Sequence, residues 1–225
     1  MKRFRELVAD IRKRYPADDF FADFEKSCRL EPFKKKHYRS YNDALILLDN
    51  ESWNILKEKA IGHFGNEREG QRKQGFFNQL NEAFAYRYLL RRGFRNVRFI
   101  KEGNERTPDI SFVDRGTQSH CEVKTIGISD GEINRRSSHK LYDCGVYFNL
   151  SRGFQSKLGA AIDRAWEQIH SLGESGLVFI LVRFDDMVLD HYRRYRKQLT
   201  EFCRSRGFEN LAIKIGHRGN KRIHI

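Results

Sequence analysis

The sequence contains no apolar run of about 18 residues and no signal-peptide pattern. We therefore expect no membrane-spanning segment and a cytoplasmic location. The four cysteines are widely scattered and form no CxxC pair. Their spacing argues against a zinc ribbon, and disulfides are not expected in a reducing compartment. We expect buried, small apolar side chains at Cys28, Cys121, Cys144 and Cys203.

Other signatures of known chemistry are missing as well. The chain has no Walker A loop, so no nucleotide-driven motor is implied, and it has no internal repeat. The histidines share no spacing typical of a histidine-based site. We interpret His63, His120, His170 and His191 as surface or core residues.

Positive charge, in contrast, is abundant. Lys and Arg number 43 against 30 Asp and Glu, which gives a formal net charge of +13. Such an excess favours a polyanionic partner, nucleic acid before a membrane surface. With 225 residues, of which 39% are hydrophobic, the chain suits one moderate domain or a core with an added subdomain.

Residues 1–70 are predicted to be helical. Apolar residues recur at helical spacing, first from Phe4 to Ile11, and Ser52 is a plausible N-cap for a later helix. This region either contacts DNA or mediates homodimerisation as a separate subdomain, or it simply packs over the core. We divide the chain into a helical region, 1–70, and a second domain, 71–225, joined by the polar segment Asn66–Gly75.

A strong helix is predicted from Phe76 to Arg92, with Gly93 as its left-handed stop. Its apolar surface is broad, which indicates a helix covered on several sides. Glu82 lies at the boundary of that surface, about 20° around the helix from Leu89. A strand from Asn96 to Ile100 follows.

The segment Thr107–Gly127 is predicted to be a β-hairpin with a turn at Asp114-Arg115-Gly116. Because strand side chains alternate, Glu122 and Lys124 share one face. If the turn centres near Gly116, antiparallel pairing brings Asp109 opposite residue 123 or so, beside Glu122. The alternative is an ordinary amphipathic hairpin with charges on its wet face.

Two carboxylates beside an ammonium suit Mg²⁺, which takes carboxylate oxygens and keeps several waters. The lysine can orient the attacking water and offset charge on a phosphate. Pro108-Asp109 followed by Glu122-Val123-Lys124 resembles the active-site signature of the PD-(D/E)XK nuclease superfamily. The resemblance implies Mg²⁺ with Mn²⁺ as a substitute, Asp109 and Glu122 as ligands, the Val123 carbonyl in the metal shell, and Lys124 as a catalytic residue.

The resemblance also implies an α/β fold. Its restriction-endonuclease-like core has the order αβββαβ, with a central mixed sheet flanked by helices, and it covers roughly 76–184. A glutamate on the first core helix often joins the metal site in that superfamily, and Glu82 is placed to do so; otherwise it is a half-exposed helix residue. Gln155 and Lys157, in the first turn of a helix predicted from Ser151 to His170, either point toward substrate or form a solvated helix end.

Beyond the hairpin, the chain is predicted to contain a long loop, a further strand and helix, and a closing hairpin. The polar stretch Ser129–Lys140 is long for a connection, and its Arg135, Arg136 and Lys140 either contact phosphates or belong to a flexible loop. A strand buried on both faces is predicted at Leu177–Phe184. A basic amphipathic helix is predicted at Asp186–Arg206, with its cations interpreted as a solvated face, and the hairpin follows from Leu211 to Ile225.

Three functions are compatible with the sequence. The first is a Mg²⁺-dependent endonuclease, with DNA preferred over RNA because of the resemblance. The second is a catalytically idle nucleic-acid-binding module on the same fold. The third is an interaction or assembly protein that acts through residues 1–70. An intact Asp, Glu and Lys set favours the first.

Overall fold

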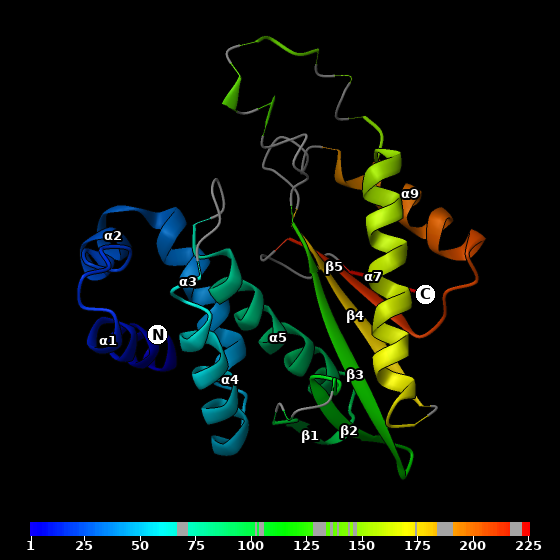
Figure 1. Ribbon diagram of the computed structural model, residues 1–225, viewed down its shortest axis with the longest axis horizontal. Helices are drawn as coiled ribbons and strands as arrows, with labels where there is room; N and C mark the ends of the chain where they lie inside the picture. Colours follow the sequence, from blue (N-terminus) through cyan, green and yellow to red (C-terminus); the bar gives the residue numbers. More distant parts are fainter. Residues whose placement is uncertain are drawn as a thin grey trace. The chain divides into compact units, whose positions relative to one another are not determined.

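The computed structural model describes residues 1–66, 72–101, 103, 106–127, 134–135, 137–138, 140–143, 145, 148–173, 175–183, 191–216 and 222–225. Within these residues the protein is α/β, with seven helices and a six-stranded mixed sheet (Figure 1). The chain forms two compact units, Met1–Ser119 and His120–Ile225. The predicted boundary near residue 70 stays a prediction.

The first unit begins with the predicted helices. They are α1 (Lys2–Arg14), α2 (Phe24–Leu30), α3 (Pro32–Leu45) and α4 (Asn50–Gly62). The apolar stripe of α1 is buried, as expected. Aromatic rings dominate the packing, with Phe4 against Phe24 and Tyr38, and Phe21 against Phe64 and Phe76. Burial of these rings holds the helices of the first unit around α5 (Gln74–Arg91).

Helix α5 is the centre of the first unit. It contacts α3, α4 and β1 (Arg95–Phe99), and every residue from Asn81 to Leu89 is buried. The predicted broad apolar surface is therefore confirmed, and Gly93 follows the helix with a φ of 82°. At this left-handed position a side chain would be strained.

The predicted cap of α4 is wrong. Asp49 is the N-cap residue, and its carboxylate accepts a 2.7 Å hydrogen bond from the backbone N–H of Ser52. An aspartate three residues upstream satisfies the exposed helix N–H better than a serine already inside the first turn. Ser52 instead accepts a 3.1 Å hydrogen bond from Phe99 N–H with its hydroxyl, which joins α4 to β1.

Strand β1 pairs antiparallel with β2 (Ile110–Asp114), and Phe99 lies opposite Ile110. The backbone carbonyl of Asp109 accepts a 2.9 Å hydrogen bond from Ile100 N–H, so the pairing extends to Asp109. Arg115 and Gly116 follow β2 with φ of 49° and 87°. Positive φ at both positions is the pattern of a two-residue type I′ hairpin turn.

The second unit contains the parallel strands β3 (Thr117–Ile126), β4 (Gly176–Val182) and β5 (Leu211–Ile215), of which β3 begins at the end of the first unit. Strand β6 (Arg222–His224) pairs antiparallel with β5, which confirms the predicted closing hairpin. Residues 217–220 lie outside the described chain. As predicted, β4 is largely buried and lies between two parallel neighbours.

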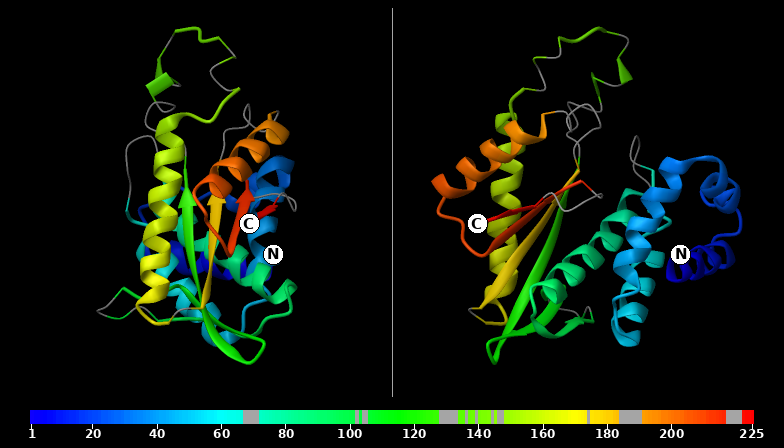
Figure 2. Two further views of the ribbon diagram at one scale, coloured as in Figure 1. Left: turned by 90° about the vertical axis from the view of Figure 1, so that its right-hand side faces the viewer. Right: turned by 180° about the vertical axis from the view of Figure 1, so that it is seen from behind.

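Helices α7 (Arg152–His170) and α9 (Tyr192–Ser205) cover one face of these strands (Figure 2). Leu158, Ile162 and Ile169 of α7 pack with Val178 and Ile180 of β4. A Cβ on Gly176 would lie 2.6 Å from the carbonyl oxygen of His120, so the close β3–β4 contact at this point requires glycine.

Three cysteines, Cys28, Cys121 and Cys203, are buried free thiols, as predicted, and Cys144 lies outside the described residues. Burial raises the pKa of Cys203 to about 12. No helix in the described ranges is long and apolar enough to span a bilayer.

Candidate functional site

Two carboxylates that the sequence assigned to the metal site contact the same lysine in the first unit. The Lys59 ammonium of α4 lies 2.9 Å from Glu82 Oε1 on α5 and 3.0 Å from Asp109 Oδ1, just before β2. The side chains are 14%, 7% and 13% exposed, respectively. The structure thus joins Glu82 and Asp109 through a shared cation that the sequence did not indicate.

Local packing places these three groups. Helix α4 contacts both α5 and β1, and the Ser52–Phe99 hydrogen bond joins α4 to β1. Asp109 is fixed through its own carbonyl, which pairs with Ile100 at the end of β1. Because all three backbones are held, the Lys59 ammonium reaches both carboxylates.

The cluster of Lys59, Glu82 and Asp109 carries two negative charges and one positive charge, and its side chains are nearly buried. Removing such groups from water costs several kcal/mol per ion unless close partners compensate. Lys59 therefore balances the two carboxylates. Glu82 is 5% exposed, so the alternative of a half-exposed helix glutamate is wrong.

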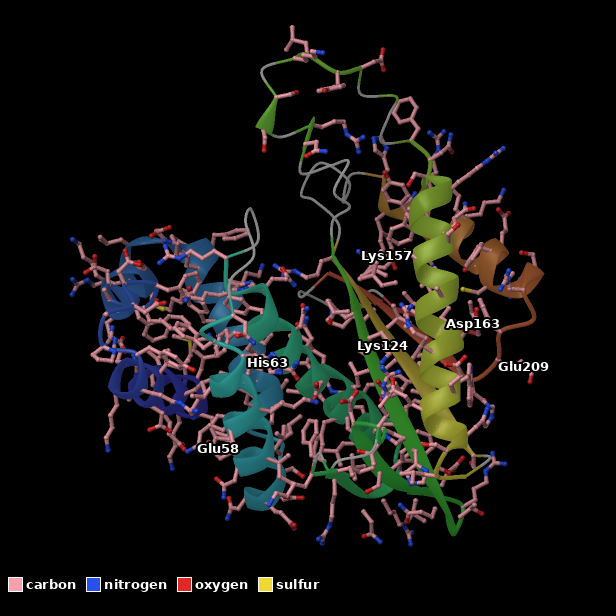
Figure 3. All side chains as sticks on the ribbon, in the orientation of Figure 1. Glu58, His63, Lys124, Lys157, Asp163 and Glu209 are labelled. Carbon is pink, nitrogen blue, oxygen red and sulfur yellow. The ribbon has the colours of Figure 1, made fainter. Side chains whose placement is uncertain are left out.

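A second cluster lies in the second unit. The Lys124 ammonium is 2.5 Å from Glu122 Oε1 and 2.5 Å from the side-chain oxygen of Gln168 on α7 (Figure 3). Glu122 is 3% exposed, whereas the Lys124 side chain is 27% exposed. Ile126, on the same strand face, packs with the apolar residues of α7. The predicted shared face of Glu122 and Lys124 is therefore the face that α7 covers.

Val123 lies between these residues in β3, opposite Phe179 of β4, and its side chain is buried. His120 is partly buried on the same strand, and this burial lowers its pKa, which favours the neutral ring. Among the described residues, no group of three or more histidine, cysteine or acidic side chains is arranged to hold a metal ion. The acidic residues of interest occur instead as the pair Glu82 and Asp109, and as Glu122 with Lys124.

The predicted nucleic-acid contacts are more scattered. Gln155 is partly buried near the start of α7. Lys157, two residues further along this helix, is exposed (Figure 3). Gln168, the amide that meets Lys124, lies about 20 Å beyond Gln155 along the helix at 1.5 Å per residue. Arg135 is partly buried, Lys140 is exposed, and Arg136 lies outside the described residues.

Helix α9 contributes a feature that its sequence had suggested to be solvated surface. Phe148, His191, Tyr192, Arg193 and Arg194 line an open cavity of about 710 Å³ at its N-terminal end. The Arg194 guanidinium lies 5.0 Å from the centre of the Phe148 ring. Aromatic rings beside exposed arginines form a surface suited to stacking bases and pairing with phosphates.

Comparisons of this chain with protein-family models, with curated proteins and with solved structures gave no match. The function proposed below therefore rests on the residues themselves.

Sequence reasoning missed Lys59 and Gln168. Both belong to amphipathic helices in which a single polar residue has no distinguishing pattern. Their roles follow from contacts 50 and 44 residues away along the chain. Of the features that sequence reasoning missed, only the α9 cavity had a signal in the sequence, which is the cluster of arginines near Tyr192.

Proposed function

We propose that this protein is a Mg²⁺-dependent endonuclease that hydrolyses phosphodiester bonds in DNA, on a restriction-endonuclease-like fold. The observation that supports it most is the Lys124 cluster. A partly exposed lysine lies beside a buried glutamate on one strand, and a glutamine from α7 holds its ammonium. The described order α5, β1, β2, β3, α7, β4 also agrees with the expected core.

The turn between β2 and β3 agrees with the predicted hairpin, because Arg115 and Gly116 both have positive φ. The pairing of Asp109 with a residue beside Glu122 stays a prediction from sequence.

The donor chemistry fits magnesium. Glu82 and Asp109 already share one cation, the Lys59 ammonium, and carboxylate oxygens are the ligands that Mg²⁺ prefers. As the superfamily resemblance implies, Asp109, Glu122 and the Val123 carbonyl would hold the ion, with Glu82 as a further carboxylate and Mn²⁺ as a substitute. When bound, the ion would supply an activated water and stabilise negative charge on the phosphate.

Lys124 would act on the same phosphate. An ammonium has three N–H donors. Two of them point to Glu122 and Gln168, and no third partner of Lys124 lies within the described chain. The remaining N–H can position the attacking water or donate to a phosphate oxygen as its charge develops. Gln168 is then a positioning residue, since it fixes the ammonium without touching substrate.

Charge supports nucleic acid as the partner. The net charge of +13 favours a polyanion, and the α9 cavity offers aromatic and guanidinium groups together. Preference for DNA rests on the superfamily resemblance. Homodimerisation, the phosphate-contacting roles of Arg135, Arg136, Lys140, Gln155 and Lys157, and the cytoplasmic location stay predictions from sequence.

The decisive experiment is a cleavage assay on single-stranded, duplex and branched DNA and on RNA, with Mg²⁺, with Mn²⁺ and with EDTA. We expect metal-dependent cleavage of at least one DNA, and much slower cleavage by Lys124→Ala under the same conditions. Binding without cleavage by wild type would favour the idle binding module. Neither binding nor cleavage would favour the interaction protein.

A further inference from the structure

Lys59 occupies a place that a divalent ion would need. We propose that its ammonium is a built-in counter-cation of the Glu82–Asp109 pair, and that a metal ion binds these carboxylates only by displacing it. The inference rests on the proposed function, because it assigns Glu82 and Asp109 to the metal site. It adds a residue from the N-terminal helices that neither the sequence pattern nor the resemblance indicated.

The distances make the two occupants mutually exclusive. Glu82 Oε1 and Asp109 Oδ1 lie 2.9 and 3.0 Å from the same Nζ atom. For tetrahedral N–H directions, these oxygens are roughly 5 Å apart. Magnesium holds its ligands at about 2.0–2.1 Å, so two neighbouring ligand oxygens come within roughly 3 Å of each other. The ion and the ammonium cannot share the space between the carboxylates.

Burial explains why some cation must be there. The two carboxylates are 7% and 13% exposed, and like charges at close range in a nearly dry place repel strongly. Lys59 offsets this repulsion in the metal-free protein. A divalent ion would offset it more completely, because its charge matches that of the pair.

A displaced Lys59 has a place to go. Lys59 also lines an open cavity of about 530 Å³, together with Glu51, Asn54, Glu58 and Lys101. Glu58 lies on α4 (Figure 3), directly before Lys59 in the sequence, and is largely exposed, with a 3.8 Å contact to Arg14. A rotamer change would move the flexible lysine from the buried pair to these exposed carboxylates without moving the helix.

Helix α4 supplies a matched control. Lys57 contacts Glu6 and Asp10 of α1 at 3.0 Å each and is 17% exposed, so it too bridges two carboxylates. Those carboxylates are each 41% exposed and can be solvated when the lysine is removed. Lys57→Met and Lys59→Met therefore remove the same group from similar ion pairs, and only the second opens a buried carboxylate pair.

The test measures Mn²⁺ binding by calorimetry and Tm in EDTA and in saturating Mn²⁺, without nucleic acid. We expect Lys59→Met to lower Tm in EDTA by about 6 °C or more. We also expect it to bind Mn²⁺ roughly tenfold tighter or better than wild type, because the ion pairs of Lys59 with Glu82 and Asp109 need not be broken. Its Tm gain with Mn²⁺ should exceed that of wild type. Lys57→Met should lower Tm while keeping wild-type Mn²⁺ affinity. Adding Glu82→Gln to Lys59→Met should remove the increase in Mn²⁺ affinity and the additional rise of Tm with Mn²⁺.

Unchanged or weaker Mn²⁺ binding by Lys59→Met would overturn the inference, as would equal tightening in Lys57→Met. Absence of Mn²⁺ binding in both wild type and Lys59→Met would overturn it too. The result of the cleavage assay is independent of the result of this metal-binding test. A wild-type protein that binds Mn²⁺ in competition with Lys59 but cleaves nothing refutes the nuclease proposal and leaves the counter-cation intact.

Discussion

Lys59 in the first unit and Lys124 in the second are each held by two oxygen acceptors, but the acceptors differ in charge. Lys59 lies between two carboxylates and is 14% exposed, whereas Lys124 lies between a carboxylate and an amide and is 27% exposed. Two carboxylates bind an ammonium as a counter-ion. One carboxylate and a neutral amide orient it and leave charge for a third partner. The role of a buried lysine therefore follows from the charge of its acceptors rather than from its exposed fraction.

Removing an acidic residue should have the largest effect on this comparison. We expect Asp109→Ala, and separately Glu122→Gln, to abolish metal-dependent cleavage while far-UV circular dichroism stays that of wild type. Each variant removes a proposed metal ligand from one of the two lysine clusters. Calorimetry with Mg²⁺ and Mn²⁺ checks the cause, and unchanged metal binding in both variants would refute the ligand assignment.

Lys124 is expected to affect the chemical step. Losing one stabiliser of developing charge commonly costs about 10²–10³ in rate, or roughly 3–4 kcal/mol. Lys124→Ala should bind DNA and metal nearly as wild type does, yet cleave that much more slowly. Lys124→Arg should fail as well, because a planar fork cannot replace a compact ammonium between Glu122 and Gln168. Single-turnover kinetics at saturating enzyme isolates this step, and wild-type rates in both variants would mean that Lys124 is only structural.

A third lysine provides the purely structural reference. Lys73 is 1% exposed, contacts the Asp18 carboxylate, and lies 4.1 Å from the centre of the Phe64 ring. Asp18→Asn should destabilise the protein by about 3 kcal/mol, because it removes the charge that pairs with the buried Lys73 ammonium at Asp18. Removing one partner of a buried ion pair costs about 3–5 kcal/mol. The low end of this range applies because the Asp18 side chain is 22% exposed. Urea unfolding checks the value, and metal affinity should not change.

The same pair makes stability depend on pH. Burial by itself would raise the pKa of Asp18, but hydrogen bonds from Lys73 and from Phe20 N–H, with the charge of Lys73, lower it below 3.8. The unfolded chain therefore binds this proton more readily. The stabilisation is complete above the ordinary carboxyl pKa and is lost as pH falls through the lowered value. In Asp18→Asn this part of the acid dependence should disappear.

Gln168 should have a smaller effect, because it acts through Lys124. We expect Gln168→Leu to lower the single-turnover cleavage rate by about tenfold, or roughly 1.4 kcal/mol, with DNA affinity unchanged. Gln168→Glu keeps an oxygen acceptor in place and should retain most of the rate. Equal losses in both variants would show that the amide does more than position the ammonium.

The α9 cavity should contribute the smallest effect, on binding alone. Affinity for duplex DNA should fall steeply with salt, and each neutralised phosphate adds about 0.9 to the log–log slope. Replacing Arg193 and Arg194 by Ala should lower that slope by about 0.9 for each arginine that pairs with a phosphate, while the cleavage rate of bound DNA is kept. A wild-type slope in the double variant would show that these arginines are solvated surface residues that do not contact DNA phosphates.

Sequence by itself determined the parts of the fold that follow from local patterns. The periodicity of apolar residues placed α1, α5 and α7 within a few residues, and the apolar run at Leu177 placed β4 as a strand buried between neighbours. Alternation along β3 was sufficient to place Glu122 and Lys124 on one face. These features depend on neighbours within a few positions, which is why a pattern can report them.

Only the tertiary structure decided which charges meet. Asp49 rather than Ser52 caps α4, because the serine is used by β1, 47 residues away. Lys59 reaches Glu82 and Asp109, and Gln168 reaches Lys124. Ionic side chains carry no periodicity that identifies their partners, and their free energy depends on burial and distance. Those two quantities exist only once the helices have packed against one another and against the strands.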